Sequence, residues 1–129
     1  MALELKKDVL SILVADDEES MRSLFERLFS GEGFSLDTVE DGFKAIEKVK
    51  AKYYNIAFID IAMPGMNGYL AFREIKKISP ALKVVMVTGY SEESVIEACL
   101  KEGASACLHK PFSLDALFSL IEKIKNEER

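Results

Sequence analysis

The sequence predicts an α/β fold in which a parallel β-sheet is covered by helices on both faces. Five short apolar, β-rich runs alternate with five amphipathic stretches along the chain. One of the runs, Ile56 to Ile59, is apolar without alternation, as expected of a strand whose two faces are both covered. A regular alternation of strands and helices implies right-handed crossovers between parallel strands. These observations together predict a doubly wound sheet.

The expected strands are apolar runs that stop at a polar residue or a turn. In chain order they are Val9–Ala15, Phe34–Val39, Ile56–Ile59, Lys83–Val87 and Ala106–His109. The expected helices follow each strand, where apolar residues recur at helical spacing. They run over about 20–30, 41–50, 67–77 and 91–102, and from 113 to near the end of the chain.

Capping and breaking residues flank these helices. Asp41, Ser91 and Ser113 are expected to cap helix N-termini, because their short polar side chains can accept a hydrogen bond from a free backbone N–H. Gly31-Glu32-Gly33 and Gly103 follow helices as stop signals, and Ser79-Pro80 breaks another. Each expected helix therefore has at least one defined end.

Composition restricts the function classes. The chain has 129 residues, which suits one domain, with an expected core over about 9–125 and short charged tails. The net charge is −5 and no basic stripe is present, so we expect no direct binding of nucleic acid by this domain. The apolar runs are strand-sized, and the N-terminus carries acids without an apolar signal core. We therefore expect a cytoplasmic domain that does not enter a membrane.

Four of the five strands end in polar residues that can carry chemistry. These residues are Asp16-Asp17, Asp60, Thr88 and Lys110. In open parallel sheets, ligands bind beyond the carboxyl ends of the strands, near the point where the strand order reverses. Residues that are far apart in the sequence are therefore expected to meet at one edge of the sheet.

Three carboxylates at that edge predict a bound divalent cation. Asp16, Asp17 and Asp60 would repel one another if all were ionised, so a proton or a cation must relieve the repulsion. Oxygen ligands select hard ions, and Mg²⁺ typically binds one or two carboxylates together with water and phosphate oxygens. For the Asp16-Asp17 pair alone, capping of the following helix explains the residues equally well.

Asp60 directly follows a buried strand, where an unpaired carboxylate is costly. Beside a divalent cation, such a carboxylate can attack phosphorus and form an acyl phosphate. Lys110 supplies a compact positive charge for a phosphoryl oxygen or for Asp60 itself. Its bond to Pro111 is a candidate for the cis form. Thr88, followed by the small Gly89, offers a hydroxyl group at the end of the fourth strand.

The combination of motifs resembles the receiver domain of two-component response regulators over nearly the whole chain. The motifs are the run Ile12 to Asp17, Asp60 with Met63-Pro64-Gly65-Met66-Asn67-Gly68, Val87-Thr88-Gly89-Tyr90, Gly103-Ala104-Ser105 and Lys110-Pro111-Phe112. The resemblance implies a flavodoxin-like fold with a five-stranded parallel sheet of order 2-1-3-4-5 and five flanking helices. It also implies a phosphoacceptor signalling switch.

The resemblance assigns roles to individual positions. Asp60 would be the phosphoryl acceptor, Asp17 a direct Mg²⁺ ligand, and Asp16 a ligand directly or through water. Ala62 would contribute its backbone carbonyl to the metal. Thr88 and Lys110 would bind the phosphoryl group.

The implied cofactor is Mg²⁺, with Mn²⁺ as a substitute. The implied donor is a sensor histidine kinase or a histidine phosphotransfer protein. The implied output is a change in the surface around the fourth helix, fifth strand and fifth helix, which controls binding of a downstream protein. Formation of a homodimer on phosphorylation is left open. The chain is expected to assist its own phosphorylation and dephosphorylation without being an enzyme that acts on an external substrate.

Two positions depart from the family pattern. Cys107 stands three residues before Lys110, where many receivers have an aromatic switch residue, and it is too small to report the same motion. We therefore expect the relay to use other groups, with Tyr90 as one candidate. Ala62 cannot orient a hydrolytic water and Tyr90 could shield it, which predicts a fairly persistent acyl phosphate.

Three other functions are considered. An aspartyl-phosphate phosphohydrolase usually has a second Asp two residues after the nucleophile, where this chain has Ala62. A flavin electron carrier would need a phosphate-binding loop after the first strand. In this chain the acids from Asp16 to Glu19 follow that strand, and they would repel the flavin phosphate. A pseudo-receiver that binds partners without phosphorylation is disfavoured by the complete acidic set with Thr88 and Lys110.

Overall fold

The strands of the computed structural model form one parallel sheet in the order β2-β1-β3-β4-β5. The structure describes residues 9–89 and 93–127. The strands are β1 (Leu10–Ala15), β2 (Phe34–Val39), β3 (Ile56–Asp60), β4 (Lys83–Thr88) and β5 (Ala106–His109). The helices are α2 (Glu19–Leu28), α3 (Gly42–Ala51), α4 (Gly68–Ile78), α5 (Glu93–Lys101) and α6 (Leu114–Glu127). The predicted doubly wound fold and its strand order are confirmed.

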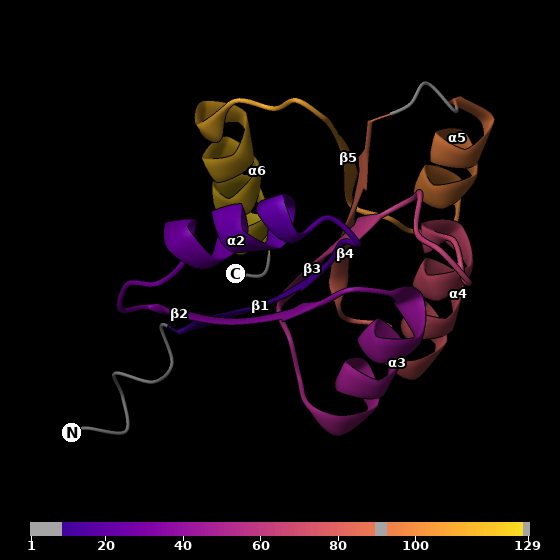
Figure 1. Ribbon diagram of the computed structural model, residues 1–129, viewed down its shortest axis with the longest axis horizontal. Coiled ribbons are helices and arrows are strands. Elements are labelled where there is room, and N and C mark those ends of the chain that lie inside the picture. The colour runs from indigo at the N-terminus through magenta and orange to yellow at the C-terminus, as the bar shows by residue number, and fades with distance from the viewer. Residues whose placement is uncertain (1–8, 90–92, 128–129) are drawn as a thin grey trace.

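The order of the sheet reverses between β1 and β3. The chain runs from β1 outward to β2, then returns to β3 on the other side of β1 (Figure 1). The register pairs Ala15 of β1 with Ile59 of β3, and Asp60 of β3 with Val87 of β4. The residues that follow these strands therefore lie side by side at one edge of the sheet, as the strand-end argument predicted.

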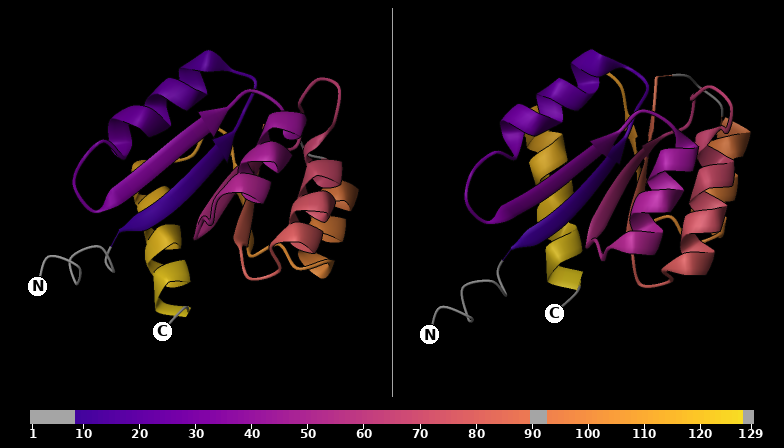
Figure 2. Two further views of the ribbon diagram at one scale, coloured as in Figure 1. Left: turned by 90° about the horizontal axis from the view of Figure 1, so that it is seen from below. Right: turned by 60° about the horizontal axis from the view of Figure 1, so that its bottom comes forward.

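Helices cover both faces of the sheet. Helices α2 and α6 lie on one face, and α3, α4 and α5 lie on the other (Figures 1 and 2). Two separate apolar cores result, because the strand residues alternate between the two faces. Phe25 of α2 and Leu117 of α6 belong to one core, and Phe72 of α4 and Cys99 of α5 belong to the other.

Side-chain caps are present at the start of three helices, and two of them, Asp41 and Ser113, were predicted. The Asp41 carboxylate accepts a hydrogen bond from the N–H of Lys44 at 2.8 Å at the start of α3. The Asn67 side chain accepts one from Leu70 at 3.0 Å at the start of α4, and the Ser113 hydroxyl accepts one from Ala116 at 3.0 Å. The expected cap at Ser91 lies outside the described residues.

The observed element ends differ from the predicted ends by two residues at most where both are defined. Strand β1 begins at Leu10, which pairs with Phe34, and Val9 before it is exposed. Helix α2 ends at Leu28, two residues before the predicted end. In the ranges 9–89 and 93–127, no helix has both the length and the apolar character needed to cross a membrane.

Candidate functional site

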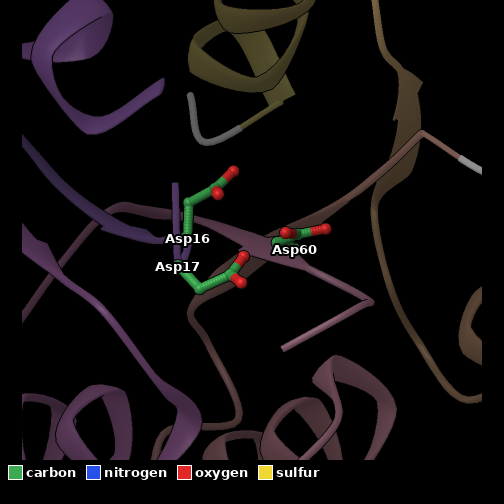
Figure 3. Close-up of side chains that lie close together, drawn as sticks. All are labelled: Asp16, Asp17 and Asp60. Carbon is green, nitrogen blue, oxygen red and sulfur yellow. The ribbon is translucent and has the colours of Figure 1, made fainter. Parts of the chain in front are cut away.

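Three carboxylates meet at the carboxyl edge of the sheet. Asp16 and Asp17 directly follow β1, and Asp60 is the last residue of β3. Each of the three side chains offers one carboxylate oxygen, and these three oxygens all lie within 4.8 Å of one another (Figure 3). Asp16 and Asp60 are buried, whereas Asp17 is exposed. The three acids that the sequence assigned to one site therefore do lie together.

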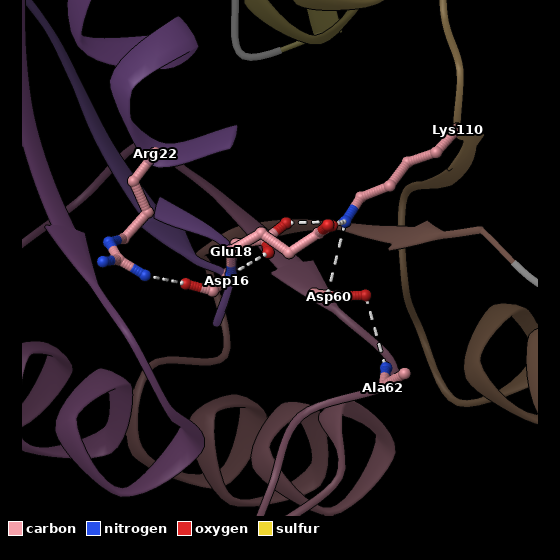
Figure 4. A network of polar contacts seen from close by, with 6 residues as sticks. All are labelled: Asp16, Glu18, Arg22, Asp60, Ala62 and Lys110. Carbon is pink, nitrogen blue, oxygen red and sulfur yellow. Dashed lines mark hydrogen bonds and ion pairs between the residues drawn. The ribbon is translucent and has the colours of Figure 1, made fainter. Parts of the chain in front are cut away.

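Lys110 reaches the same site from the segment after β5. Its ammonium group lies 2.8 Å from an oxygen of Asp16, 3.0 Å from Glu18 and 3.5 Å from Asp60 (Figure 4). The peptide bond between Lys110 and Pro111 is cis, as the sequence suggested. The backbone N–H of Lys110 donates to the carbonyl oxygen of Thr88 at 2.7 Å, which ties the lysine to the end of β4.

The acidic loop after β1 is held by local hydrogen bonds. The backbone N–H of Glu18 donates to the Asp16 carboxylate at 2.9 Å. The guanidinium of Arg22, on the first turns of α2, donates to the carbonyl oxygen of Asp16 at 2.8 Å. These contacts fix both the backbone and the side chain of Asp16 relative to α2 (Figure 4).

The loop after β3 holds Asp60 from the other side. The N–H of Ala62 donates to the Asp60 carboxylate at 3.3 Å. The N–H of Ile61 donates to the carbonyl oxygen of Val87 at 2.9 Å, and the N–H of Gly68 donates to the carbonyl oxygen of Ile61 at 2.7 Å. The loop therefore folds back onto the end of β3 and keeps the Asp60 carboxylate in place.

The electrostatics of the site favour an added positive charge. Burial raises the pKa of Asp60 to about 6, the Asp16 carboxylate adds to the effect, and Lys110 and the Ala62 N–H oppose it. Burial alone would lower the pKa of Lys110, but its pairing with Asp16 and Glu18 holds that pKa above its ordinary value. One lysine therefore stays charged among several acids, and it offsets only part of the cost of ionising Asp60.

The donor set fits a hard dication. The three acids offer only oxygen atoms, and they form the sole group of three or more acidic, histidine or cysteine ligands within metal-binding reach among the described residues. Oxygen-only sets suit Mg²⁺ and similar ions. A cavity of about 360 Å³ adjoins them, and its lining comprises Asp17, Glu18, Asp60, Ala62, Gly89 and Lys110. The cavity is large enough for a metal ion with a phosphoryl group.

The remaining predicted residues are placed as follows. Thr88 is buried at the end of β4, and Gly89 follows it at the cavity wall. Cys107 lies on β5, half-buried against the core beneath α3, α4 and α5. Tyr90 lies outside the described residues. The sequence reasoning missed Glu18 and Arg22 as members of the site, because only the folded chain brings Glu18 to Lys110 and Arg22 to Asp16.

Known proteins share this sequence and fold. Residues 12–122 match the family model of the response regulator receiver domain. The chain is 33% identical over 112 residues to the DNA-binding transcriptional regulator NtrC of Escherichia coli K12, which covers 87% of the chain but 24% of that protein. A similar match to the transcriptional regulatory protein ZraR of Escherichia coli O157:H7 is 35% identical and covers 90% of the chain and 26% of that protein. The chain thus spans about a quarter of the length of these curated relatives.

Solved structures give the same assignment. A response regulator receiver domain protein (CheY-like) from Methanospirillum hungatei is 27% identical, with a TM-score of 0.86, over 93% of this chain and 97% of that one. The response regulator TrrA from Thermotoga maritima, solved in complex with Mg²⁺ and beryllium fluoride, is 31% identical, with a TM-score of 0.79, over 90% and 99%. The chain therefore belongs to the response regulator receiver domain family, and its function class is that of a phosphoacceptor signalling switch.

Proposed function

We propose that Asp60 is the residue that accepts the phosphoryl group, and that the donor is a phosphohistidine on a sensor histidine kinase or a histidine phosphotransfer protein. One observation carries this proposal. Three carboxylates lie within 4.8 Å of one another, and the Lys110 ammonium lies 3.5 Å from the Asp60 carboxylate. This arrangement supports the assignment of Asp60 as nucleophile and Lys110 as fixed cation, with the three carboxylates as ligands of a dication.

The chemical step needs little from the protein beyond position and charge. An oxygen of Asp60 attacks phosphorus, the phosphorus–nitrogen bond to the donor imidazole breaks, and the imidazole nitrogen leaves with the electron pair and takes a proton. Lys110 pairs with an oxygen of the transferred group, and the Thr88 hydroxyl donates to another. A bound Mg²⁺ supplies charge neutralisation between the carboxylates and the phosphoryl oxygens.

The proposed metal ligands are Asp17 and Asp60 directly, Asp16 directly or through water, and the backbone carbonyl of Ala62. The oxygen-only chemistry of the acids supports this assignment. We expect Mn²⁺ to substitute, because it accepts the same hard ligands. Beyond its own phosphorylation and dephosphorylation, the domain is proposed to catalyse no reaction on an external substrate.

The proposed output is a change in the surface formed by α5, β5 and α6. Gly89 lies at the cavity wall and precedes α5 in the chain, and Lys110 follows β5. Binding of the phosphoryl group at Lys110 and Thr88 would therefore alter the segments that begin and end these elements. We propose that this surface binds a downstream protein or, after phosphorylation, a second copy of the chain.

We also propose that residues 1–129 form a single receiver domain with a core over about 9–125. The family match over 12–122 and the single five-stranded sheet support this extent.

Intact-mass measurement tests the proposed acceptor. The parent protein is incubated with acetyl phosphate with and without Mg²⁺, alongside Asp60→Ala. The expected result is one phosphoryl adduct on the parent that requires Mg²⁺ and is absent from the variant. A matched control is Asp115→Ala, because Asp115 is an exposed aspartate in the first turn of α6.

The adduct should also be lost on treatment with hydroxylamine, which cleaves acyl phosphates. An adduct on Asp60→Ala, or none on the parent with Mg²⁺ present, would refute the proposal.

A further inference from the structure

Glu18 is an acidic residue that contacts the lysine of the phosphorylation site. Its carboxylate lies 3.0 Å from the Lys110 ammonium, nearly as close as the Asp16 carboxylate at 2.8 Å. Its side chain is 60% exposed, lines the cavity together with Lys110, and extends toward the lysine (Figure 4). Lys110 itself is only 13% exposed and is the cation that a phosphoryl oxygen must reach.

The side chain of Glu18 has no helix-capping role that would explain this position. Glu18 is the N-cap residue of α2, yet its side chain makes no capping hydrogen bond. Its backbone N–H, not its carboxylate, holds the Asp16 side chain. The ion pair with Lys110 is the contact that the carboxylate makes, and the chain separation of 92 residues makes this a tertiary contact.

Lys110 cannot keep all its partners when a phosphoryl group enters. The carboxylates of Asp16 and Asp60 already lie with that of Asp17 within reach of one ion, and a bound cation would take over the neutralisation of their charge. Glu18 has no such substitute, because it lies outside the group of three carboxylates that could share an ion among the described residues. An incoming anionic donor must therefore displace Glu18 from Lys110 and also approach its negative charge.

We propose that Glu18 is a specificity-determining residue that slows phosphorylation by small anionic donors, because its carboxylate competes with the phosphoryl group for Lys110. This inference rests on the proposed function, since it assumes that Asp60 is the acceptor. With acetyl phosphate, the bond from Asp60 to phosphorus forms while the bond from phosphorus to the acetyl oxygen breaks, and acetate leaves with the electron pair. Glu18 acts before this step, because Lys110 binds the phosphoryl group less readily while it is paired with the Glu18 carboxylate.

The test compares three variants with the parent. Glu18→Gln removes the charge at nearly constant size. Glu18→Asp keeps the charge but shortens the side chain by one methylene, which withdraws it from Lys110 and favours a local capping bond. Glu19→Gln is the matched control, because it removes the same charge one residue further on, in the first turn of α2. Circular dichroism verifies that all variants are folded.

Two quantities are measured in the presence of Mg²⁺. One is the rate of adduct formation with acetyl phosphate, and the other is the affinity for beryllium fluoride, a phosphoryl mimic, followed by the amide NMR signals of Gly89 and Lys110. Both Glu18 variants are expected to raise the rate and the affinity by about two- to fivefold, as suits the loss of a partly exposed ion pair. Glu19→Gln is expected to leave both near the parent values.

The outcomes separate this inference from the proposed function. If the parent forms no adduct with Mg²⁺ present, the proposed function fails. If the parent forms the adduct but Glu18→Gln matches Glu19→Gln, the role of Glu18 is refuted and the proposed function stands. If the rate and the affinity rose in Glu18→Gln but not in Glu18→Asp, the inference would also be refuted. Such a result would show that the effect depends on the charge of residue 18 and not on its pairing with Lys110.

Discussion

A Cβ atom added to Gly68 would lie 2.2 Å from the backbone oxygen of Asp60 and 2.7 Å from the Cα atom of Ile61. Gly68 is the first residue of α4, and its N–H donates to the carbonyl oxygen of Ile61. The start of the helix therefore rests directly on the backbone of the proposed acceptor residue. Any side chain at position 68 must displace that backbone.

The first prediction follows from this close approach. Gly68→Ala should lower the free energy of unfolding by about 2–3 kcal/mol, as overpacking against a rigid backbone does. It should also slow Mg²⁺-dependent adduct formation, because the end of β3 must move. Urea unfolding and intact mass measure the two effects.

Gly31→Ala is the matched control for Gly68→Ala. A Cβ atom at position 31 would meet nothing within 4 Å. Gly31→Ala should therefore leave the rate of phosphorylation unchanged and the free energy of unfolding close to that of the parent. Equal effects of the two substitutions would show that the contact with Asp60 is not the cause.

The second prediction concerns the charge of Asp60 in the absence of metal. Burial and the nearby Asp16 carboxylate oppose its ionisation and raise its pKa to about 6. Asp60→Asn removes the charge at nearly constant shape, so at pH 7.5 without metal it should raise the free energy of unfolding by about 1 kcal/mol. Urea unfolding in the presence of a chelator gives the value.

Added Mg²⁺ should remove this difference in unfolding free energy between Asp60→Asn and the parent. The ion binds the folded parent more tightly than the variant, and such binding stabilises the folded state by mass action. If the variant were less stable than the parent in the chelator, the carboxylate of Asp60 would not be under the electrostatic stress proposed here.

The meeting of Asp16 and Asp60 at the carboxyl edge of the sheet could be predicted from the sequence, because the strands that carry them follow local rules. Asp60 ends a run of buried apolar residues, and Asp16 ends another, so the parallel topology alone brings them together. The caps at Asp41 and Ser113 could be predicted for the same reason, since a cap depends on residues within one turn.

Contacts between distant side chains were not predictable in this way. Glu18 and Lys110 are 92 residues apart, and nothing in the pattern of either segment gives the reach of the glutamate across the cavity. The approach of Gly68 to Asp60 was likewise not predictable, because a glycine at the start of a helix can be present for many reasons. The sequence therefore predicted which residues gather at the site, but not how the surrounding residues hold them.

A buried hydrogen bond provides the third prediction, which concerns stability and pH. The hydroxyl of Tyr54, a fully buried residue, donates to the Asp37 carboxylate at 2.6 Å. Burial raises the pKa of Tyr54, and the bond to Asp37 raises it further. Burial also acts to raise the pKa of Asp37, but hydrogen bonds from Tyr54 and Lys52 outweigh it and lower that pKa overall.

The signs of these shifts define a pH window. Because the Tyr54 pKa is raised, its contribution to stability is complete below about pH 10 and is lost at higher pH. Because the Asp37 pKa is lowered, its contribution is complete above about pH 4 and is lost as the pH falls further. Tyr54→Phe should therefore cost about 1–2 kcal/mol of unfolding free energy at pH 5–9.

Urea unfolding of parent and Tyr54→Phe at several pH values measures this difference, which should shrink below about pH 4 as Asp37 takes up a proton. Tyr53→Phe is the control, since Tyr53 is 59% exposed. A cost that did not depend on pH across the acidic range would indicate lost packing instead of a lost charge-assisted bond.

The fourth prediction concerns the relay of the signal. Cys107, the residue at the position of the usual aromatic switch, is packed against the core and is too small to swing between two environments. We therefore expect the output to pass through the loop after β4, with Tyr90 as a participant. Tyr90→Ala should reduce the phosphorylation-induced shifts of amide NMR signals in α5 and β5. Equal shifts in this variant and in the parent would remove Tyr90 from the relay.

The fifth prediction concerns the lifetime of the acyl phosphate. Ala62 lines the cavity beside Asp60, and its side chain has no group that could orient an attacking water. Asn at this position adds an amide that can hold a water molecule in line with the phosphorus–oxygen bond. Ala62→Asn should therefore lose its phosphoryl group severalfold faster than the parent, as followed by intact mass after removal of the donor.

Ala62→Val is the control for this comparison, because valine adds bulk at the same place without a polar group. If it accelerates the loss as much as asparagine does, the effect comes from a disturbed loop. If neither variant differs from the parent, water does not approach the acyl phosphate past position 62, and the persistence predicted for the parent would have to come from shielding elsewhere at the cavity mouth.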